Sequence, residues 1–183
     1  MEDTRVDQIF NYFIKFGDDD YIGEEVSQIE HMTQAAMLAE ENNENEEFIV
    51  ACLLHDIGHL LAKDGVRMGD YGVSNHEKIG SVYLKNLGFS QYVCDLVEGH
   101  VTAKRYLTYR NPNYYNKLSD ASKTTLKYQG GPMNKEEAEE FEQNPHFNDI
   151  LKIRSYDETS KVPEKYIHEL EHYRAIINRV LHK

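Results

Sequence analysis

Cysteine and long hydrophobic runs are both scarce in this chain of 183 residues. Its two cysteines, Cys52 and Cys94, lie in apolar stretches and make no disulfide framework, so we interpret them as reduced core residues. No segment approaches the roughly 20 apolar residues that a membrane-spanning helix requires, and the first residues lack the apolar core of a signal peptide. We therefore expect a cytoplasmic protein without a membrane partner.

Basic residues are outnumbered as well. The chain has 20 Lys and Arg residues against 32 Asp and Glu residues, which gives a net charge of −12. Because binding to a phosphate backbone depends on basic patches, this balance argues against a nucleic-acid partner. Hydrophobic residues at 40% and charged residues at 28% are typical of a globular protein. At this length we expect one domain over residues 1–183.

Sustained alternation of apolar and polar residues, the pattern of a β-strand, is missing. Apolar residues recur instead at helical spacing, so the fold is predicted to be all-α, a single helical bundle. The predicted helical stretches are residues 6–16, 32–38, 48–61, 79–87 and 92–107.

Capping residues and helix breakers set the expected boundaries. Asn134, followed three residues later by Glu137, is typical of a capping-box start. Pro163 is expected to begin a last helix that runs through Ile177. The other expected boundaries are Gly65, Gly69 and Gly72 after the His-Asp segment, Asn75 and Gly88 around the helix of His76, Ser90 before the helix of His100, and the stop Gly130-Gly131-Pro132.

His55 and Asp56 place an imidazole beside a carboxylate in the apolar run 51–59. Adjacent side chains on a helix diverge by about 100°, so a metal ion held by both has to lie where the helix end bends. The carboxylate then remains free to reach a second ion. Further candidate ligands lie near other expected helix ends or later in the chain: His31, His76, His100, Asp120 and Asp157.

Taken singly, each of these histidines is more often a core or surface residue than a metal ligand. Together they fall on four successive helical segments, so a bundle can bring them to one interior point. The histidines of the C-terminal part have polar surroundings and are expected to be surface residues: His146, His168, His172 and His182.

The order His, His-Asp, His, His, Asp resembles that of the HD-domain superfamily of metal-dependent helical enzymes. Most members resemble phosphohydrolases, whereas a smaller branch, which includes myo-inositol oxygenase, activates O2 at a mixed-valent di-iron pair. This chain looks like the organophosphonate-cleaving oxygenases of that branch. The likeness runs from about residue 20 to residue 173 and rests on the blocks 20–24, 53–59, 71–78, 98–106, 118–122, 128–133 and 152–157.

The resemblance implies two iron ions, mixed-valent Fe(II)/Fe(III), with O2 as co-substrate. One iron is bound by His31, His55, Asp56 and Asp157, and the other by Asp56, His76 and His100, so that Asp56 bridges the pair. Mixed imidazole and carboxylate ligation also suits manganese or zinc, so the choice of iron rests on the resemblance. Asp120 lies in a context where phosphohydrolases supply their last carboxylate, whereas the organophosphonate branch points to Asp157, which we prefer.

The resemblance also implies a small organophosphonate substrate, 1-hydroxy-2-aminoethylphosphonate, cleaved at its C–P bond to glycine and inorganic phosphate. Candidates to hold the phosphonate lie within about one helical turn of a ligand; they are His59, Lys104 and Arg154, joined by the hydroxyl of Ser122. Glu24 is expected to bind the amine. Tyr21 is expected to occupy the metal position that O2 needs until Glu24 moves toward the substrate.

Three alternatives stay open at this point. A trimethylammonium analogue of the substrate would yield glycine betaine and phosphate. An HD-domain phosphohydrolase would use the same ligands with redox-inert ions. A metal-stabilised module would show no turnover.

Overall fold

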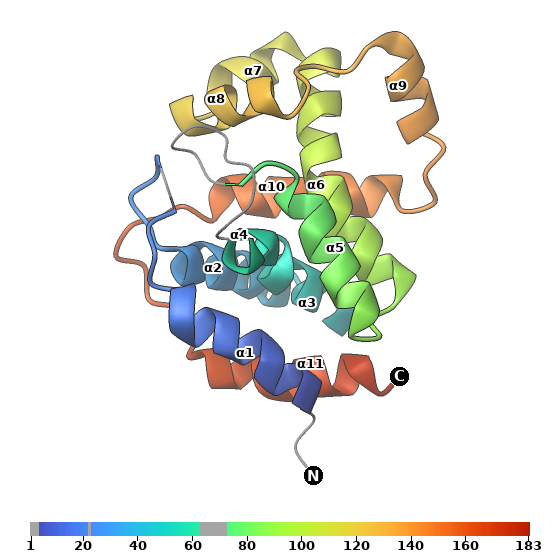
Figure 1. The fold of residues 1–183 in the computed structure, drawn as a ribbon. Coiled ribbons are helices and arrows are strands. Elements are labelled where there is room, and N and C mark those ends of the chain that lie inside the picture. The colour runs from blue at the N-terminus through green and yellow to red at the C-terminus, as the bar shows by residue number, and fades with distance from the viewer. Residues whose placement is uncertain (1–3, 22, 63–72) are drawn as a thin grey trace.

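The computed structural model describes residues 4–21, 23–62 and 73–183, which form eleven α-helices and no β-strand (Figure 1). The predicted all-α class is thereby confirmed. The expected breaks at Gly65, Gly69 and Gly72 lie outside the described residues. The helices are α1 (Thr4–Phe16), α2 (Gln28–Glu41), α3 (Glu46–Leu54), α4 (Ile57–Leu61), α5 (His76–Asn86), α6 (Gln91–Arg110), α7 (Pro112–Lys117), α8 (Asp120–Tyr128), α9 (Lys135–Phe141), α10 (Phe147–Thr159) and α11 (Leu170–Leu181).

Side-chain caps fix several helix starts. At α2 the Glu30 backbone N–H donates to Ser27 Oγ (3.3 Å), and the Ser27 N–H donates to Glu30 Oε2 (2.7 Å), which makes a reciprocal capping box. The predicted capping box of Asn134 and Glu137 is confirmed at α9. The hydroxyl of Ser90 accepts a backbone N–H at the start of α6, as predicted. Local sequence therefore decides where these helices begin.

Asn75 and Gly88 bound α5, as predicted, through their backbone conformations. Asn75 is the N-cap residue with a φ of 61°, and its side chain makes no capping hydrogen bond. Asn75 instead provides a left-handed backbone conformation at the helix start, which Asn adopts more readily than most residues. Gly88, with a φ of 91°, follows the end of the helix.

The apolar run 48–61, expected as one helix, is divided into α3 and α4 at His55 and Asp56. Asp56 has a φ of −104° and a ψ of 10°, and its side chain makes no capping bond at α4. Gly58 lies where α4 closely approaches the start of α5, so there is no room for a side chain at this position. A Cβ atom at Gly58 would lie 1.9 Å from the carbonyl oxygen of His76. The bend therefore leaves the Asp56 carboxylate available and brings His76 next to it.

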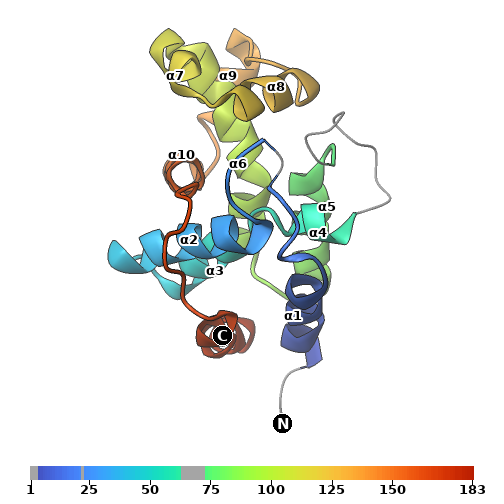
Figure 2. The same cartoon turned by 90° about the vertical axis from the view of Figure 1, so that its left-hand side faces the viewer.

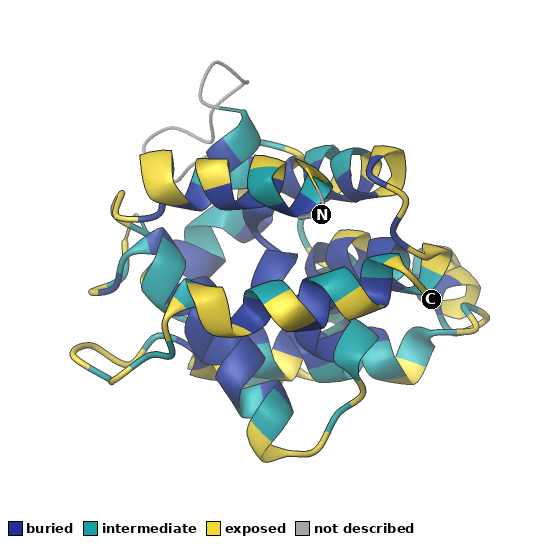
Figure 3. Cartoon of the chain, turned by 90° about the horizontal axis from the view of Figure 1, so that it is seen from below, coloured by how far each residue is buried: buried dark blue, intermediate teal, exposed yellow. Residues whose placement is uncertain are grey.

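The central helices α2 and α6 both pack against α3 and α10. α6 packs against α5 as well. α1 and α11 lie at one end of the molecule, while α7, α8 and α9 gather at the opposite end (Figures 1 and 2). Buried residues occupy the inner faces of the helices in the view from below (Figure 3). Cys52 and Cys94 are buried and unpaired, as predicted.

Within the described part of the chain, no helix is both long enough and apolar enough to cross a bilayer.

The predicted helix from Pro163 through Ile177 is wrong at its start, because α11 begins at Leu170. Glu164 has a φ of 57°, a left-handed conformation that does not continue an α-helix. The Gln34 side chain also engages both backbone groups of Val162: Gln34 Nε2 donates to Val162 O (2.9 Å), and Val162 N donates to Gln34 Oε1 (3.1 Å). These tertiary contacts keep residues 160–169 non-helical beside α2.

Candidate metal centre

Three buried ligand atoms meet between α2, α3 and α10. They belong to His31, His55 and Asp157, and all three atoms lie within 4.8 Å of one another. His31 Nε2 is 3.0 Å from His55 Nε2 and 3.4 Å from Asp157 Oδ1. Separations of roughly 3.0–3.4 Å are those of neighbouring ligands around an ion at about 2.1 Å. The geometry therefore suits one metal ion.

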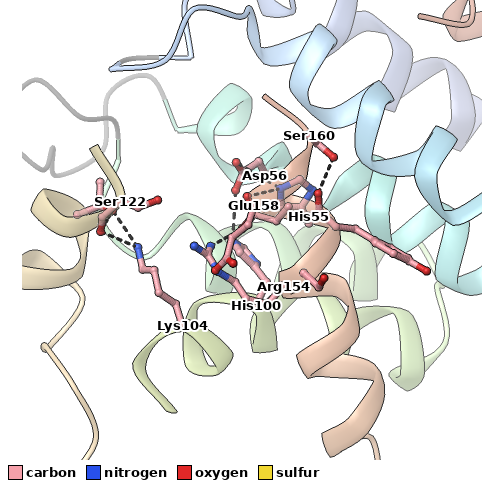
Figure 4. A network of polar contacts seen from close by, with 12 residues as sticks. His55, Asp56, His100, Lys104, Ser122, Arg154, Glu158 and Ser160 are labelled. Carbon is pink, nitrogen blue, oxygen red and sulfur yellow. Dashed lines mark hydrogen bonds and ion pairs between the residues drawn. The ribbon is translucent and has the colours of Figure 1, made fainter. Parts of the chain in front are cut away.

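A second group of buried ligand atoms comes from Asp56, His76 and His100. Asp56 Oδ1 lies 3.1 Å from His76 Nε2 and 3.3 Å from His100 Nε2. The other carboxylate oxygen, Oδ2, faces the first group at 3.4 Å from His31 Nε2 and 3.5 Å from His55 Nε2. Asp56 thus stands between the two groups with one oxygen turned to each. Figure 4 shows His55, Asp56 and His100 close together at this point.

The four imidazoles are oriented by the backbone. The Nδ1–H of each ring donates to a carbonyl oxygen: His31 to Ser160 (2.8 Å), His55 to Cys52 (2.8 Å), His76 to Val73 (3.3 Å) and His100 to Val97 (2.6 Å). Each neutral ring therefore carries its lone pair on Nε2, toward the centre. Carbonyls that fix the ring orientation in this way are the usual outer partners of metal-bound histidines.

The centre favours positive charge between its ligands. Two Nε2 lone pairs only 3.0 Å apart, those of His31 and His55, repel unless a cation lies between them. Burial lowers the pKa of His31, but hydrogen bonds and charge from Asp157 and Asp56 outweigh it and raise that pKa to about 9. Asp157 Oδ1 is buried, and its contact with His31 Nε2, at 3.4 Å, is longer than an ordinary hydrogen bond. A metal ion would satisfy all of these groups, so the residues fit one.

Comparisons with known proteins agree with this centre. The HD domain family profile matches residues 28–140. This span includes all the ligand residues of the two groups apart from Asp157. A 1-hydroxy-2-(trimethylamino)ethyl phosphonate dioxygenase (glycine-betaine-forming) of Leisingera caerulea is 41% identical over 179 residues, which cover 97% of this chain and 91% of the relative. The chain belongs to the HD-domain phosphonate dioxygenases.

Two further relatives span most of this oxygenase. A hydroxymethylphosphonate dioxygenase of Gimesia maris is 36% identical over 179 residues, covering 97% of the chain and 88% of the relative. An uncharacterised protein of Acanthamoeba polyphaga mimivirus is 47% identical over 175 residues, covering 94% of the chain and 80% of the viral protein. The named relatives share a phosphonate as substrate and differ in what else the substrate carries.

A cavity of about 220 Å³ opens beside the centre of the oxygenase. Because drug-sized ligands occupy pockets of roughly 300–1,000 Å³, this volume fits a smaller molecule. Asp56, His76, His100 and Asp157 line it on the metal side. The predicted substrate-binding side chains all line it as well; they are Glu24, His59, Lys104, Ser122 and Arg154.

Lys104 and Arg154 supply buried positive charge to the cavity. Lys104 Nζ donates to the carbonyl oxygen of Ser122 (3.4 Å), as Figure 4 shows, and to Thr125 Oγ1 (2.9 Å). Burial, assisted by the charge of Arg154, lowers the pKa of Lys104 to about 7. Arg154 pairs through Nη1 with Asp157, while its Nη2 is buried without a hydrogen-bond partner among the described residues. That unpaired donor is suited to an anionic ligand.

His59 offers a neutral donor. Its ring stacks on His76 with centroids 3.9 Å apart, and the Val73 N–H donates to its Nδ1 (3.3 Å). Nδ1 therefore accepts, so the proton of the neutral ring is on Nε2. Burial and the neighbouring His76 hold the pKa of His59 well below its ordinary value, which keeps the ring neutral.

Tyr21 and Glu24 lie together at one side of the cavity. The Tyr21 ring stacks on His31, and burial, with the charges of Asp56 and Asp157, raises the pKa of its hydroxyl well above the ordinary value. Glu24 Oε1 accepts from Ser119 Oγ (2.6 Å). The predicted pair therefore reaches both the metal centre and the cavity.

Sequence reasoning missed several cavity residues, among them Lys161, Gln28 and Gln129. Lys161 lies four residues after Asp157, the same spacing that singled out Lys104 after His100, so that criterion could have found it. Gln28 and Gln129 each have a buried side-chain oxygen without a hydrogen-bond partner among the described residues. The sequence contains no comparable signal for these two.

Asp120, the alternative last ligand, is not part of either buried group of ligand atoms. Its side chain is exposed at the start of α8 and lies 4.0 Å from Lys123 Nζ. The predicted surface histidines are exposed or partly exposed; they are His146, His168, His172 and His182.

One additional group, Glu40, His168 and His172, has metal-like spacing. The Glu40 carboxylate is already hydrogen-bonded by His172 (2.8 Å) and by Tyr173 OH (3.0 Å). These contacts join α2 to α11 without an ion, so we treat the group as a structural contact.

Proposed function

We propose that this oxygenase binds a mixed-valent pair of iron ions and uses O2 to cleave 1-hydroxy-2-aminoethylphosphonate into glycine and inorganic phosphate. The supporting observation is that two buried His-His-Asp groups lie side by side, linked by Asp56, next to a cavity that contains Lys104 and Arg154. Two imidazoles and one carboxylate, with open positions, form the ligand set of non-haem iron oxygenases.

The proposed ligands follow from the two groups. His31, His55 and Asp157 would hold one ion, His76 and His100 the other, and Asp56 would contribute one oxygen to each. Bound there, the iron pair supplies the activation of O2 and the removal of hydrogen from C1 of the substrate.

The cavity residues would bind and orient the two ends of the substrate. Arg154 Nη2 and the ammonium of Lys104 would donate charge-assisted hydrogen bonds to the phosphonate oxygens; both residues line the cavity, and Arg154 Nη2 has no other partner among the described residues. The Nε2–H of His59 and the hydroxyl of Ser122 add neutral donors. Glu24, which also lines the cavity, would accept from the C2 ammonium. The substrate is then held at both ends with C1 toward the metal side.

Tyr21 would act as a removable cover on the centre. Its ring lies against His31, and the charges of Asp56 and Asp157 help to raise the pKa of its hydroxyl. We propose that Glu24, when it binds the substrate amine, draws this segment away and opens the position that O2 requires. Such coupling would limit O2 activation to the moment when substrate is present.

The overall reaction balances without an external reductant. A 1-hydroxyphosphonate and one O2 give one carboxylic acid and one phosphate, with both oxygen atoms of O2 in the products. The C–P bond breaks, C1 is oxidised to the level of a carboxylate, and O2 is the oxidant. The oxygenase therefore needs no reductase site.

The trimethylammonium substrate is the second candidate, because a relative with 41% identity bears the name of that activity. A quaternary nitrogen has no N–H to donate and is usually recognised by aromatic faces. Among the described residues that line the cavity, Tyr21 is the single Tyr, Phe or Trp side chain. The carboxylate of Glu24 therefore favours the primary amine.

The test is an assay of the iron-loaded protein that follows O2 uptake and phosphate release together. The substrates are the amino, trimethylammonium and unsubstituted hydroxyphosphonates. We expect one O2 per phosphate, no phosphate under anaerobic conditions, and the highest kcat/KM with the amino compound. Phosphate release from a phosphate monoester without O2 uptake would instead establish a phosphohydrolase. Absence of turnover with every metal would leave a structural module.

A further inference from the structure

Lys161 forms an ion pair with Glu24 inside the cavity. Lys161 Nζ lies 2.9 Å from Glu24 Oε1, and both side chains are only 13% exposed. Ser119 Oγ donates to the same oxygen. Because the pair is largely shielded from water, its attraction exceeds that of an ordinary surface pair. The carboxylate expected to receive the substrate amine thus already has a cation from the protein.

The position of Lys161 is fixed from both sides by α2. The carbonyl oxygen of the preceding residue, Ser160, accepts from His31 Nδ1 (2.8 Å). Both backbone groups of the following residue, Val162, are bound by the Gln34 amide. His31 and Gln34 lie one turn apart on the same helix. Lys161 is therefore aimed at Glu24 by an anchored backbone.

Lys161 also contacts the other member of the proposed cover. Its Nζ lies 5.4 Å from the centre of the Tyr21 ring, within the range of a cation–π contact. It lies 3.5 Å from Ser122 Oγ as well, toward the part of the cavity where Lys104 reaches the Ser122 carbonyl. One ammonium group thus bridges Tyr21, Glu24 and the proposed phosphonate subsite.

We propose that Lys161 occupies, in the substrate-free protein, the cation position that the C2 ammonium of the substrate takes on binding. The inference rests on the proposed function. One carboxylate cannot pair closely with two ammonium groups without repulsion between them, so the substrate cation displaces Lys161 from Glu24. The displaced ammonium then has the phosphonate end of the cavity, at Ser122, within reach. A hydroxyphosphonate without a cation leaves the Lys161–Glu24 pair intact.

The test compares binding rather than turnover. Anaerobic calorimetric titration of the metal-loaded protein gives Kd for 1-hydroxy-2-aminoethylphosphonate and for hydroxymethylphosphonate. In Lys161→Met the competitor is gone, so the ratio of the two Kd values shifts toward the amino compound by roughly fivefold or more. Lys161→Arg retains the charge and keeps the parent ratio. Lys161→Gln serves as a second neutral variant if the methionine variant does not fold.

Each outcome decides the matter. A shift of the ratio in the neutral variants, absent in Lys161→Arg, supports exchange of cations on Glu24. Equal weakening of both ligands identifies Lys161 as a phosphonate anchor or a packing residue and overturns the proposal, as does an unchanged ratio. If the parent protein binds neither compound, the proposed function itself fails and this inference falls with it.

Discussion

The ring of Tyr21 lies almost flat against the imidazole of His31, with centroids 4.2 Å apart and planes inclined by 15°. Tyr21→Phe keeps the stacking surface and removes only the hydroxyl. We expect the iron-loaded variant to turn over substrate but to lose its mixed-valent state faster in air when substrate is absent. Electron paramagnetic resonance followed over time measures that loss. Tyr166→Phe is the matched control, because Tyr166 is 74% exposed. Equal air stability of Tyr21→Phe and the parent would refute the cover.

Asp56 is the only carboxylate of the described centre that turns an oxygen to each histidine group. Asp56→Ala should therefore weaken binding at both positions, by about 100-fold or more, since loss of even an outer partner costs 10–100-fold. Metal content per chain after dialysis is the measurement, with circular dichroism to show that the helices remain. Two tightly bound ions in this variant would contradict a bridging role.

Asp157 and Asp120 make a matched pair of aspartates, one buried beside His31 and one exposed on α8. Asp157→Ala should lose metal from the His31 and His55 position and abolish turnover. Asp120→Ala should keep both the metal content and the activity, with a stability change within about 0.5 kcal/mol. The reverse pattern would assign the last ligand to Asp120.

Lys104 gives the phosphonate affinity a pH dependence. Burial and Arg154 lower the pKa of Lys104 to about 7, so its ammonium is present below that pH and is lost as the pH rises through it. We expect Kd for the phosphonate to rise above pH 7. In Lys104→Met the contribution of the ammonium to this dependence should vanish. Kd at pH 6 should increase by about ten- to a hundredfold, because a hydrogen bond worth about 1.5–3 kcal/mol is lost.

The methionine variant also separates the ionisation of Lys104 from that of the phosphonate. Ionisation of the phosphonate itself persists in Lys104→Met and supplies the baseline. Parallel pH profiles for the parent and the variant would show that Lys104 does not contact the ligand.

Gly58 allows α4 to touch the start of α5. A Cβ atom there meets the His76 carbonyl oxygen at 1.9 Å, so Gly58→Ala forces the backbone of a ligand-bearing helix to move. We expect a loss of stability of about 3 kcal/mol and weaker metal binding. Gly80→Ala is the control, since its Cβ meets nothing closer than 3.3 Å. Denaturant unfolding and metal titration of the two variants make the comparison, and equal behaviour would contradict the role of Gly58.

Several features of the fold were predictable because they depend on neighbours in the chain. Helical periodicity gave the all-α class, and the capping box of Asn134 and Glu137 lies where it was predicted. The divergence of adjacent side chains indicated that a metal ion held by both His55 and Asp56 needs a helix end there, although the run 48–61 was expected as one helix. By contrast, Pro163 indicated a helix that the structure lacks, because Glu164 is left-handed and Gln34 holds the Val162 backbone.

The sequence by itself determined the all-α class, the inventory of imidazoles and carboxylates, and the resemblance that orders them. The resemblance favoured Asp157 over Asp120 as the last ligand, but the position of Asp157 beside His31 depends on packing, because α10 lies against α2 while Asp120 is exposed on α8. The pairing of Lys161 with Glu24 joins residues 137 positions apart. Such contacts arise from the way helices pack on one another, and no local pattern encodes them; the tertiary structure alone decided which charges meet in the cavity.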